Sequence, residues 1–428
     1  MRGLETELDI TGLDFEGRGV ARVEGRVVFV GGALPDERVR VQITHEKKRF
    51  AQAQLLEVLS SSPYRRVAPC RYDERCGGCG FQHVHDEAQM DLKTRVWLEQ
   101  LLRIGRVQPE ELLAPISSKS WHYRSRARLS WHSATQQLGF LERGSHRVVR
   151  IEQCLVLPEV VSHRLADIKA LCAEVAHAIV AVEIHQGSDV VQVVIHANQK
   201  LSPHRFLQSA LAWAAEDGIF WQFVLRGGGT QYLPADAPAL SYSLPEFGLH
   251  IPFTAEDFTQ VNPEVNAQMV KRAVEALQLP ENAWVLDAFC GLGNFSFALA
   301  QSGAQVLGVE GVDEMVQKAS ALANRLGLEE RCRFERADLF SPTKAQLKRF
   351  EAYPYWLLDP PRAGAQALVE AVGGRCRPKR IVYVSCDSGT FARDAGILVG
   401  KGYRYTKGQL LNMFPQTTHV ESLNVFEL

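Results

Sequence analysis

The chain lacks a long hydrophobic run and an excess of either charge over its 428 residues. No apolar stretch approaches the roughly 20 residues of a membrane-spanning helix, so we expect no membrane partner. The opening MRGLETELDI carries acidic residues and no apolar segment long enough for a signal peptide, which predicts a cytoplasmic protein. The formal net charge of −1 does not by itself indicate a nucleic-acid-binding protein.

Internal repeats and low-complexity tracts are also lacking, and nothing in the sequence suggests more than a monomer. The nine cysteines stand in a chain that we expect to be cytoplasmic, so a disulfide framework is not expected. Metal binding and catalysis are therefore the first roles to consider for these thiols.

The length predicts about three domains, at about 150 residues each. Residues 1–59 contain five short strand patterns separated by Gly, Pro and Asp turns, which predict a small OB-like barrel. A stabilising β cap without a ligand is the alternative. Residues 60–250 combine a cysteine-rich loop, an amphipathic helix near 86–104 and an antiparallel β region with one or two helices, which predicts a central α+β domain.

Residues 251–428 alternate apolar strands, glycine turns and helices. The runs WVLDAF, QVLGVE, YWLLDP and RIVYVSC are short and almost continuously apolar, as expected for parallel strands buried on both faces. This pattern predicts a doubly wound α/β domain of Rossmann-like type.

A nucleotide pocket is predicted where the first of these strands meets DAFCGLGNF. Glycines in this turn allow close backbone approach to a ligand, although a tight turn without a ligand is the alternative. Glu310 ends the next strand and is placed to accept hydrogen bonds from ribose hydroxyls. Asp338 is expected to end a third strand and to hold an adenine amino group. The loop has no third glycine or basic residue for a pyrophosphate, so S-adenosylmethionine fits better than a dinucleotide. In DPPR, Asp359 is placed at the same sheet edge, with a solvated Pro-rich turn as the alternative.

Cys386 follows the strand RIVYVS and is expected at the same carboxyl edge. Uracil C5 is a poor nucleophile until a thiolate adds at C6, so a cysteine here predicts covalent methyl transfer. Glu421, flanked by apolar residues, is the candidate base that removes the C5 proton. The alternatives are an inert packed cysteine and a surface glutamate on the last strand.

Three cysteines, Cys70, Cys76 and Cys79, form a C-x5-C-x2-C loop, and Cys154 is the natural fourth ligand. Four thiolates satisfy either Zn²⁺ or a [4Fe-4S] cluster, so the spacing leaves the metal open.

Positive charge is concentrated between residues 119 and 150, where seven Lys or Arg stand against one acid, Glu142. Within this segment, Arg124, Arg126 and Arg128 alternate in WHYRSRARLSWH and are expected to share one strand face. Cations for phosphates and rings for unstacked bases predict RNA contact, and a solvated cationic strand is the alternative.

The motifs Gln260-Val261-Asn262, DAFCGLGNF, Glu310, DPPR, VSCDSGTFARD and FPQTTHVESL occur in this order. Together they resemble the RNA 5-methyluridine methyltransferase family over nearly the whole chain. The resemblance implies that Cys386 is the nucleophile and Glu421 the base. It also implies that S-adenosylmethionine and the target base are surrounded by Gln260, Phe289, Asn294, Glu310, Asp338 and Asp359.

The N-terminal barrel, similar to a TRAM domain, and the cysteine spacing resemble the subgroup of this family that methylates 23S ribosomal RNA. That resemblance implies a [4Fe-4S] cluster in the central domain, held by Cys70, Cys76, Cys79 and Cys154. The chain departs from the family where SCNP is usual, because it reads SCDS, and Asp387 is expected to raise the pKa of the neighbouring thiol. The alternative functions are a cytosine-C5 RNA methyltransferase and a non-catalytic iron-sulfur RNA-binding protein.

Overall fold

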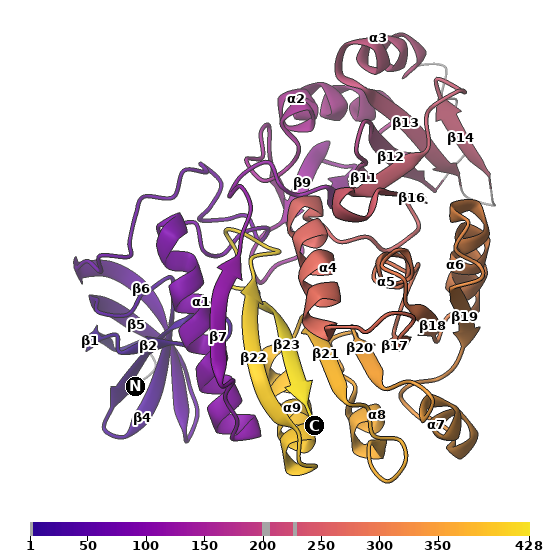
Figure 1. Cartoon of the computed structure of the whole chain (residues 1–428). Coiled ribbons are helices and arrows are strands. Elements are labelled where there is room, and N and C mark those ends of the chain that lie inside the picture. The colour runs from indigo at the N-terminus through magenta and orange to yellow at the C-terminus, as the bar shows by residue number, and fades with distance from the viewer. Residues whose placement is uncertain (1–2, 199–205, 226–228) are drawn as a thin grey trace. The chain divides into compact units, whose positions relative to one another are not determined.

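The computed structural model describes residues 3–198, 206–225 and 229–428 (Figure 1). The chain divides into two compact units. Unit 1 consists of Met1–Glu99, Phe140–Ile151 and Phe414–His419, and unit 2 contains the remaining segments.

Unit 1 is built on a six-stranded sheet in the order β1-β5-β6-β4-β3-β2. Its strands are β1 (Glu5–Asp9), β2 (Gly12–Leu13), β3 (Gly19–Val23), β4 (Arg26–Gly31), β5 (Arg38–Glu46) and β6 (Phe50–Ser60). Pairing is antiparallel except between β4 and β6. Alternate residues of β5, such as Val39 and Val41, are fully buried in the core of this sheet.

The prediction of five strands was nearly correct, because ELDITGL forms two strands, β1 and β2. At the break between them, Ile10 donates its backbone N–H to Glu37 and Thr11 donates to Val20, so two consecutive residues bond to different segments. Unit 1 also contains β10 (Val148–Arg150) and all but the last residue of α1 (Asp86–Gln100).

The larger sheet of unit 2 has eight strands in the order β19-β18-β17-β20-β21-β23-β22-β7 (Figure 1). They are β7 (Glu111–Ile116), β17 (Trp284–Ala288), β18 (Gln305–Glu310), β19 (Cys332–Arg336), β20 (Tyr355–Leu358), β21 (Arg380–Ser385), β22 (Arg404–Leu411) and β23 (Glu421–Glu427). The strands from β19 to β21 are parallel, as predicted, whereas β23 runs antiparallel to both of its neighbours.

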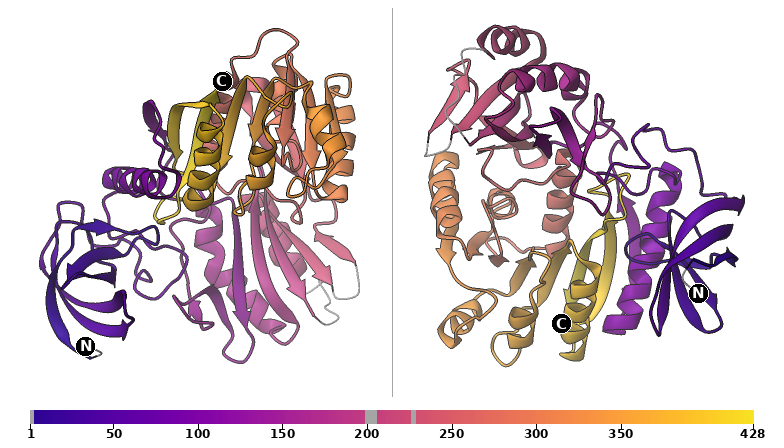
Figure 2. Two further views of the ribbon diagram at one scale, coloured as in Figure 1. Left: turned by 90° about the horizontal axis from the view of Figure 1, so that it is seen from below. Right: turned by 180° about the vertical axis from the view of Figure 1, so that it is seen from behind.

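Helices connect the strands of this sheet, which is seen from below and from behind in Figure 2. They are α4 (Pro263–Leu277), α5 (Ser296–Gln301), α6 (Asp313–Leu326), α7 (Lys344–Phe350), α8 (Gln366–Ala371) and α9 (Ser388–Gly400). Chain order reverses at β17, because β18 lies on one side of it and β20 on the other. Ligands in open α/β sheets bind at such a switch point.

Edge strand β7 pairs in parallel with β22 although it precedes residues 251–428, the segment predicted to form the catalytic domain. Its sequence ELLAPI is mostly exposed and contains Pro115, so it lacks the apolar pattern of a buried strand. Sequence periodicity therefore gave no signal for it.

The second sheet of unit 2 contains β8 (Arg126–His132), β11 (Ile179–Gln186), β12 (Val191–Ala197), β13 (Ile219–Leu225) and β14 (Thr230–Leu233), with the first residues of β9 (Gln137–Leu141) paired to β8. Helices α2 (Glu159–Glu174) and α3 (Leu207–Asp217) accompany it, and β15 (Leu240–Leu244) and β16 (Leu249–Phe253) form a separate hairpin. The region was predicted to be antiparallel, which is wrong for β12 and β13, because α3 connects them as a parallel pair.

The chain also has short π-helical and 3-10 segments at Leu101–Gly105 and Pro245–Phe247. Among the helices that the structure describes, none combines the length and apolar character needed to cross a membrane.

Candidate active site

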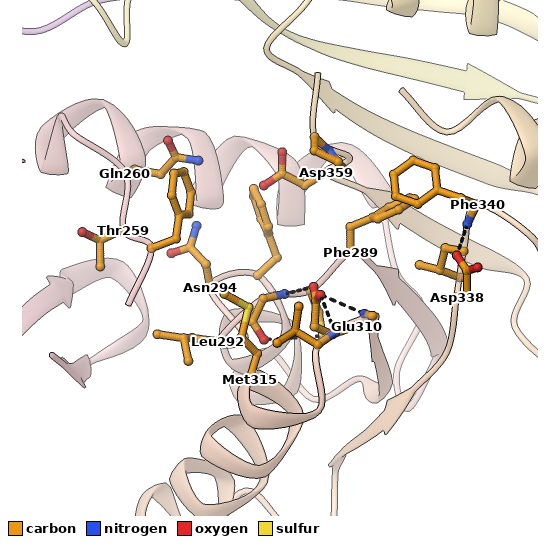
Figure 3. A pocket seen from close by; sticks show the side chains of 18 of the residues that line it. Thr259, Gln260, Phe289, Leu292, Asn294, Glu310, Met315, Asp338, Phe340 and Asp359 are labelled. Atoms are coloured by element: carbon orange, nitrogen blue, oxygen red, sulfur yellow. Dashed lines mark hydrogen bonds between the residues drawn. The ribbon is translucent and has the colours of Figure 1, made fainter. Parts of the chain in front are cut away.

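A cavity of about 380 Å³ lies where β17, β18 and β20 end, beside the switch point (Figure 3). Its lining includes all six residues predicted to surround a cofactor, namely Gln260, Phe289, Asn294, Glu310, Asp338 and Asp359. The volume is in the range of small-molecule sites, about 300–1,000 Å³. The structure thus brings these residues around one cavity, and their role as cofactor ligands stays a prediction.

The turn after β17 takes a shape that few residues allow. Gly293 has a φ of +93°, and a Cβ there would lie 2.7 Å from the ring of Phe297. Phe289 also has a positive φ, +65°, which is rare for a bulky residue and occurs mainly where function requires it. The backbone N–H groups of Phe289 and Cys290 both donate to the carbonyl of Val309, which fixes this turn on β18.

Glu310 is held rigidly at the end of β18 by backbone donors (Figure 3). Its Oε2 accepts from the N–H of Gly291 at 3.1 Å, and its Oε1 accepts from Gly311 at 2.8 Å and Val312 at 3.1 Å. A carboxylate has about four acceptor positions, so this one keeps capacity for ligand hydroxyls.

Asp338 was predicted to end a strand but lies two residues beyond β19, in the loop that follows. Its Oδ1 accepts from the N–H of Phe340 at 2.9 Å, which places the Phe340 ring 5.6 Å from that of Phe289. The two rings provide apolar walls for a flat ligand group.

Several lining residues were missed by the sequence reasoning, including Tyr242, Phe258, Met315 and Phe340. Phe258, in the segment just before Gln260, is 65% exposed, and an exposed ring beside a cavity is a signal of base stacking. Its position next to the QVN motif was the only clue available in the sequence.

Asn294 already uses most of its hydrogen-bonding capacity within the protein. Its Oδ1 accepts from Tyr242 and from Asn266, both at 3.1 Å, and its Nδ2 donates to Asn266 at 2.9 Å. One amide hydrogen therefore remains for a ligand.

Acidic groups give this region a negative potential. Burial raises the pKa of Asp359 to about 7, and burial, with smaller contributions from Asp359 and Glu310, raises that of Asp287 to about 7. Asp287 accepts a hydrogen bond from Ser296, and its Oδ1 has no partner in the described residues. Clustered carboxylates favour a cationic ligand over a phosphate.

Cys386 follows the last residue of β21, and Asp387 then caps α9 by accepting from the N–H of Thr390 at 2.9 Å. In the antiparallel pairing of β21 with β23, Ser385 lies opposite Ser422. One step further along this register, Cys386 faces Glu421, and residues so paired have Cβ atoms about 5 Å apart. Glu421 is only 5% exposed, so the alternative of a surface glutamate is wrong.

The Cys386 thiol is protonated at neutral pH in the ligand-free protein. Burial, followed by the carboxylates of Glu421 and Asp359, raises its pKa to about 12. Asp387 also raises this pKa, as predicted from the sequence, and the cation of Arg362 lowers it. Asp359 thus lies close to the thiol and also lines the cavity.

The predicted metal ligands are divided between the two units, with Cys70, Cys76 and Cys79 in unit 1 and Cys154 in unit 2. All four thiols are partly exposed, and Cys76 Sγ accepts from the N–H of Gly78 at 3.4 Å. In residues 3–198, 206–225 and 229–428, no three His, Cys, Asp or Glu side chains are grouped closely enough to hold a metal ion.

The arginines expected to share one strand face are only partly so arranged, because β8 begins at Arg126 and leaves Arg124 outside the strand. Arg126 donates to the carbonyl of Asp257 at 2.7 Å, and Arg128 pairs with Glu183. Arg124 donates to the carbonyl of Arg126 at 3.0 Å, so all three cations have partners within the protein, although Arg128 remains 58% exposed.

Comparison with known proteins identifies relatives over the full length of the chain. The tRNA (uracil-5-)-methyltransferase family matches residues 87–427, and the TRAM domain matches residues 1–56. A protein of Neisseria lactamica named 23S rRNA (uracil(1939)-C(5))-methyltransferase RlmD is 41% identical and covers 99% of this chain and 97% of its own. A Dichelobacter nodosus protein with the same name is 40% identical over 96% of both chains.

Among solved structures, the Pyrococcus abyssi tRNA (uracil-54, C5)-methyltransferase in complex with S-adenosyl-L-homocysteine has a TM-score of 0.75. It covers 98% of this chain and 100% of its own at 23% identity, a likeness of fold. The predicted TRAM domain and the Rossmann-like methyltransferase fold are confirmed by these comparisons.

Replacing Asp387 by Asn removes one carboxylate near the thiol and keeps a residue that caps helices equally well. We expect the Cys386 pKa to fall, so that iodoacetamide alkylates this thiol about two- to threefold faster at pH 8. Wild-type alkylation should still be accelerating at pH 10, because the thiol pKa lies above it. Mass spectrometry of the Cys386 peptide measures both rates. Asp313→Asn, in the first turn of α6, is the control, and equal rates in all three proteins would contradict the expectation.

Proposed function

The chain belongs to the tRNA (uracil-5-)-methyltransferase family, and we propose that it methylates C5 of uridine 1939 in 23S ribosomal RNA. It is an S-adenosylmethionine-dependent RNA uracil-C5 methyltransferase. The choice of RNA and position is supported by the names of relatives that match nearly the whole chain at about 40% identity.

The observation that carries the proposal is that Cys386 and Glu421 lie one step beyond the last pair of the β21–β23 register, with the Glu421 carboxylate close enough to raise the pKa of the thiol. A nucleophile and a base must act on adjacent ring carbons of one uracil, C6 and C5, so they must face each other across a site only one base wide. Asp359 lines the cavity and also acts on the Cys386 thiol, which supports a methyl donor and a target base held at the same sheet edge.

The cavity suits S-adenosylmethionine, which supplies a methyl group on a positively charged sulfur when it is bound. We propose that Glu310 holds the ribose hydroxyls, Asp338 holds the adenine amino group and Phe289 packs on the adenine ring. Gln260, Asn294 and Asp359 then face the methyl donor and the target base. The carboxylates around Asp287 and Asp359 favour the sulfonium charge.

The proposed reaction begins when the Cys386 thiol loses its proton to water and the thiolate adds to C6 of the uracil. Electron density at C5 then attacks the methyl carbon, and the bond from that carbon to the donor sulfur breaks. Glu421 takes the remaining C5 proton as the C6–S bond breaks, which restores the double bond and frees the thiolate. Because the target carbon is shielded within a stack, the base must be flipped out of the RNA.

We propose that residues 1–59 and the cationic residues 119–150 bind the RNA, and that residues 251–428 carry the chemistry. The exposed guanidinium of Arg128 and the exposed ring of Phe258 support this division. The TRAM match over residues 1–56 supports it for the N-terminal sheet.

We also propose a [4Fe-4S] cluster on Cys70, Cys76, Cys79 and Cys154. The donor chemistry fits, because four cysteine thiols can ligate such a cluster, all four are partly exposed, and Gly78 donates an N–H to Cys76 Sγ, as expected around ligating sulfur. The described geometry does not close a ligand group, and no step of the proposed reaction passes through the cluster.

A methylation assay tests the function. With labelled S-adenosylmethionine and a 23S ribosomal RNA fragment containing position 1939, label should appear in 5-methyluridine. Cys386→Ala should abolish incorporation while cofactor binding, measured by calorimetry, is kept. Label in 5-methylcytidine would favour the cytosine-C5 alternative, and absence of label would favour a non-catalytic RNA-binding protein. The cytosine enzymes generally carry a second cysteine after the Pro of this motif, where DPPR has Arg362.

Replacing Glu421 by Gln removes the proposed base and keeps its shape. Addition and methyl transfer should proceed, but the C5 proton should remain, so methylated RNA should stay bound to Cys386. Denaturing gel electrophoresis should detect this adduct, and Glu427→Gln at the far end of β23 should not accumulate it. Product release at the wild-type rate would assign proton removal to another group.

Anaerobic purification should yield a brown protein with about four iron atoms per chain. Cys76→Ser should lose the iron, whereas Cys376→Ala, at a buried cysteine elsewhere in the chain, should retain it. Iron and sulfide analysis provides the measurement. Stoichiometric zinc would identify the other metal that four thiolates bind, and a metal-free protein would remove the cluster from the proposal.

A further inference from the structure

Gln416, in the loop between β22 and β23, is hydrogen-bonded within unit 1 through both its side chain and its backbone. The loop, Phe414–His419, belongs to unit 1, although both strands belong to unit 2. Gln416 at its centre is fully buried and has a φ of +66°, a conformation that residues other than glycine rarely adopt. Strained conformations of this kind persist only where the surroundings determine them closely.

The side chain of Gln416 is recognised at both ends of its amide. Its Oε1 accepts from Gln89 Nε2 at 2.9 Å and from Arg66 at 3.0 Å, and its Nε2 donates to Asp86 at 2.7 Å. Donors meet the amide oxygen and a carboxylate meets the amide nitrogen. Neither a shorter side chain nor a charged one satisfies this arrangement.

The backbone of Gln416 is bound as completely as the side chain. Its N–H donates to Gln89 Oε1 at 3.0 Å, and its carbonyl accepts from Gly80 at 3.1 Å and Phe81 at 3.0 Å. Gly80 and Phe81 directly follow Cys79. The loop that carries three cysteines therefore also binds Gln416.

Both flanks of the loop have contacts in unit 1 as well. Lys93, itself 3% exposed, donates to the carbonyl of Phe414 at 3.1 Å. A Cβ on Gly17 would lie 2.2 Å from Thr418 Cγ2, so the turn between β2 and β3 packs directly on this residue. The loop is thus fixed at its start, centre and end.

We propose that Gln416 is a positioning residue that fixes Glu421 opposite Cys386, an inference that rests on the proposed function. Only Val420 separates the loop from Glu421, the first residue of β23. The hydrogen bonds that hold Gln416 therefore fix the start of β23 and, with it, the position of the carboxylate of its first residue. Cys386 and the cofactor cavity lie at the ends of β17, β18, β20 and β21, none of which adjoins this loop in the sequence.

The consequence is a separation of reaction steps. Loss of the hydrogen bonds that hold Gln416 should leave thiol addition and methyl transfer intact. It should slow the step in which Glu421 removes the C5 proton. A misplacement of about 1 Å costs about a hundredfold in rate, so release should slow by about ten- to a hundredfold. The denaturation-stable adduct should accumulate accordingly.

The experiment compares Gln416→Ala and Gln89→Ala with the full-length wild type and with Thr417→Ala. Among the residues that the structure describes, the Thr417 hydroxyl bonds to Phe414 and His419 and not to Gln416 or its partners, so its removal perturbs the same loop and leaves the Gln416 contacts in place. Single-turnover reactions measure adduct formation and product release separately, and calorimetry measures binding of S-adenosylmethionine.

Both glutamine variants should bind S-adenosylmethionine and form adduct as the wild type does, with release slowed, whereas Thr417→Ala should release normally. Gln89→Ala keeps the test valid if Gln416→Ala fails to fold. Unchanged release in either folded variant, with only a lower melting temperature, would overturn the inference and leave the proposed function standing. A wild type that methylates uridine without any adduct would instead remove the proposed mechanism.

Discussion

The antiparallel pairing of β21 with β23 is the constraint on which the candidate site depends. Backbone hydrogen bonds hold this register over six residue pairs, from Arg380 with Glu427 to Ser385 with Ser422. A slip of one residue would turn the Glu421 carboxylate to the other face of the sheet, away from the thiol. Main-chain bonds therefore decide to which face of the sheet the Glu421 carboxylate points, whereas the exact position of this first residue of β23 also depends on the loop that precedes it.

Burial gives the site its chemical character. The thiol and the surrounding carboxylates are removed from water, so each raises the cost of charging its neighbours, and the pKa values of Cys386, Asp287 and Asp359 all rise. Such a site is poorly suited to holding a free thiolate in the resting state and well suited to holding a cation. A positively charged methyl donor would offset the repulsion among these carboxylates.

Sequence reasoning placed Phe289, Glu310 and Asp359 at the cavity because each of them lies at the end of a strand with a clear apolar pattern. WVLDAF, QVLGVE and YWLLDP end at one sheet edge, so Phe289, Glu310 and Asp359 had to meet there. Phe258 and Tyr242 were missed because they come from an irregular segment and a hairpin without such a period. The edge strand β7 was missed for the same reason.

The sequence alone determined the TRAM domain at the N-terminus, the Rossmann-like fold, the position of the thiol after a core strand and part of the cavity lining. The hydrophobic pattern of each strand and the Gly and Pro residues of the turns suffice to predict these features, because strand ends in a parallel sheet share one edge. Only the tertiary structure decided that Glu421 is buried opposite Cys386 and that Gln416 is enclosed by Gln89, Arg66 and Asp86. Those contacts join residues more than 300 positions apart in the chain, or pair strands whose register depends on the turn between them, and no local pattern encodes either.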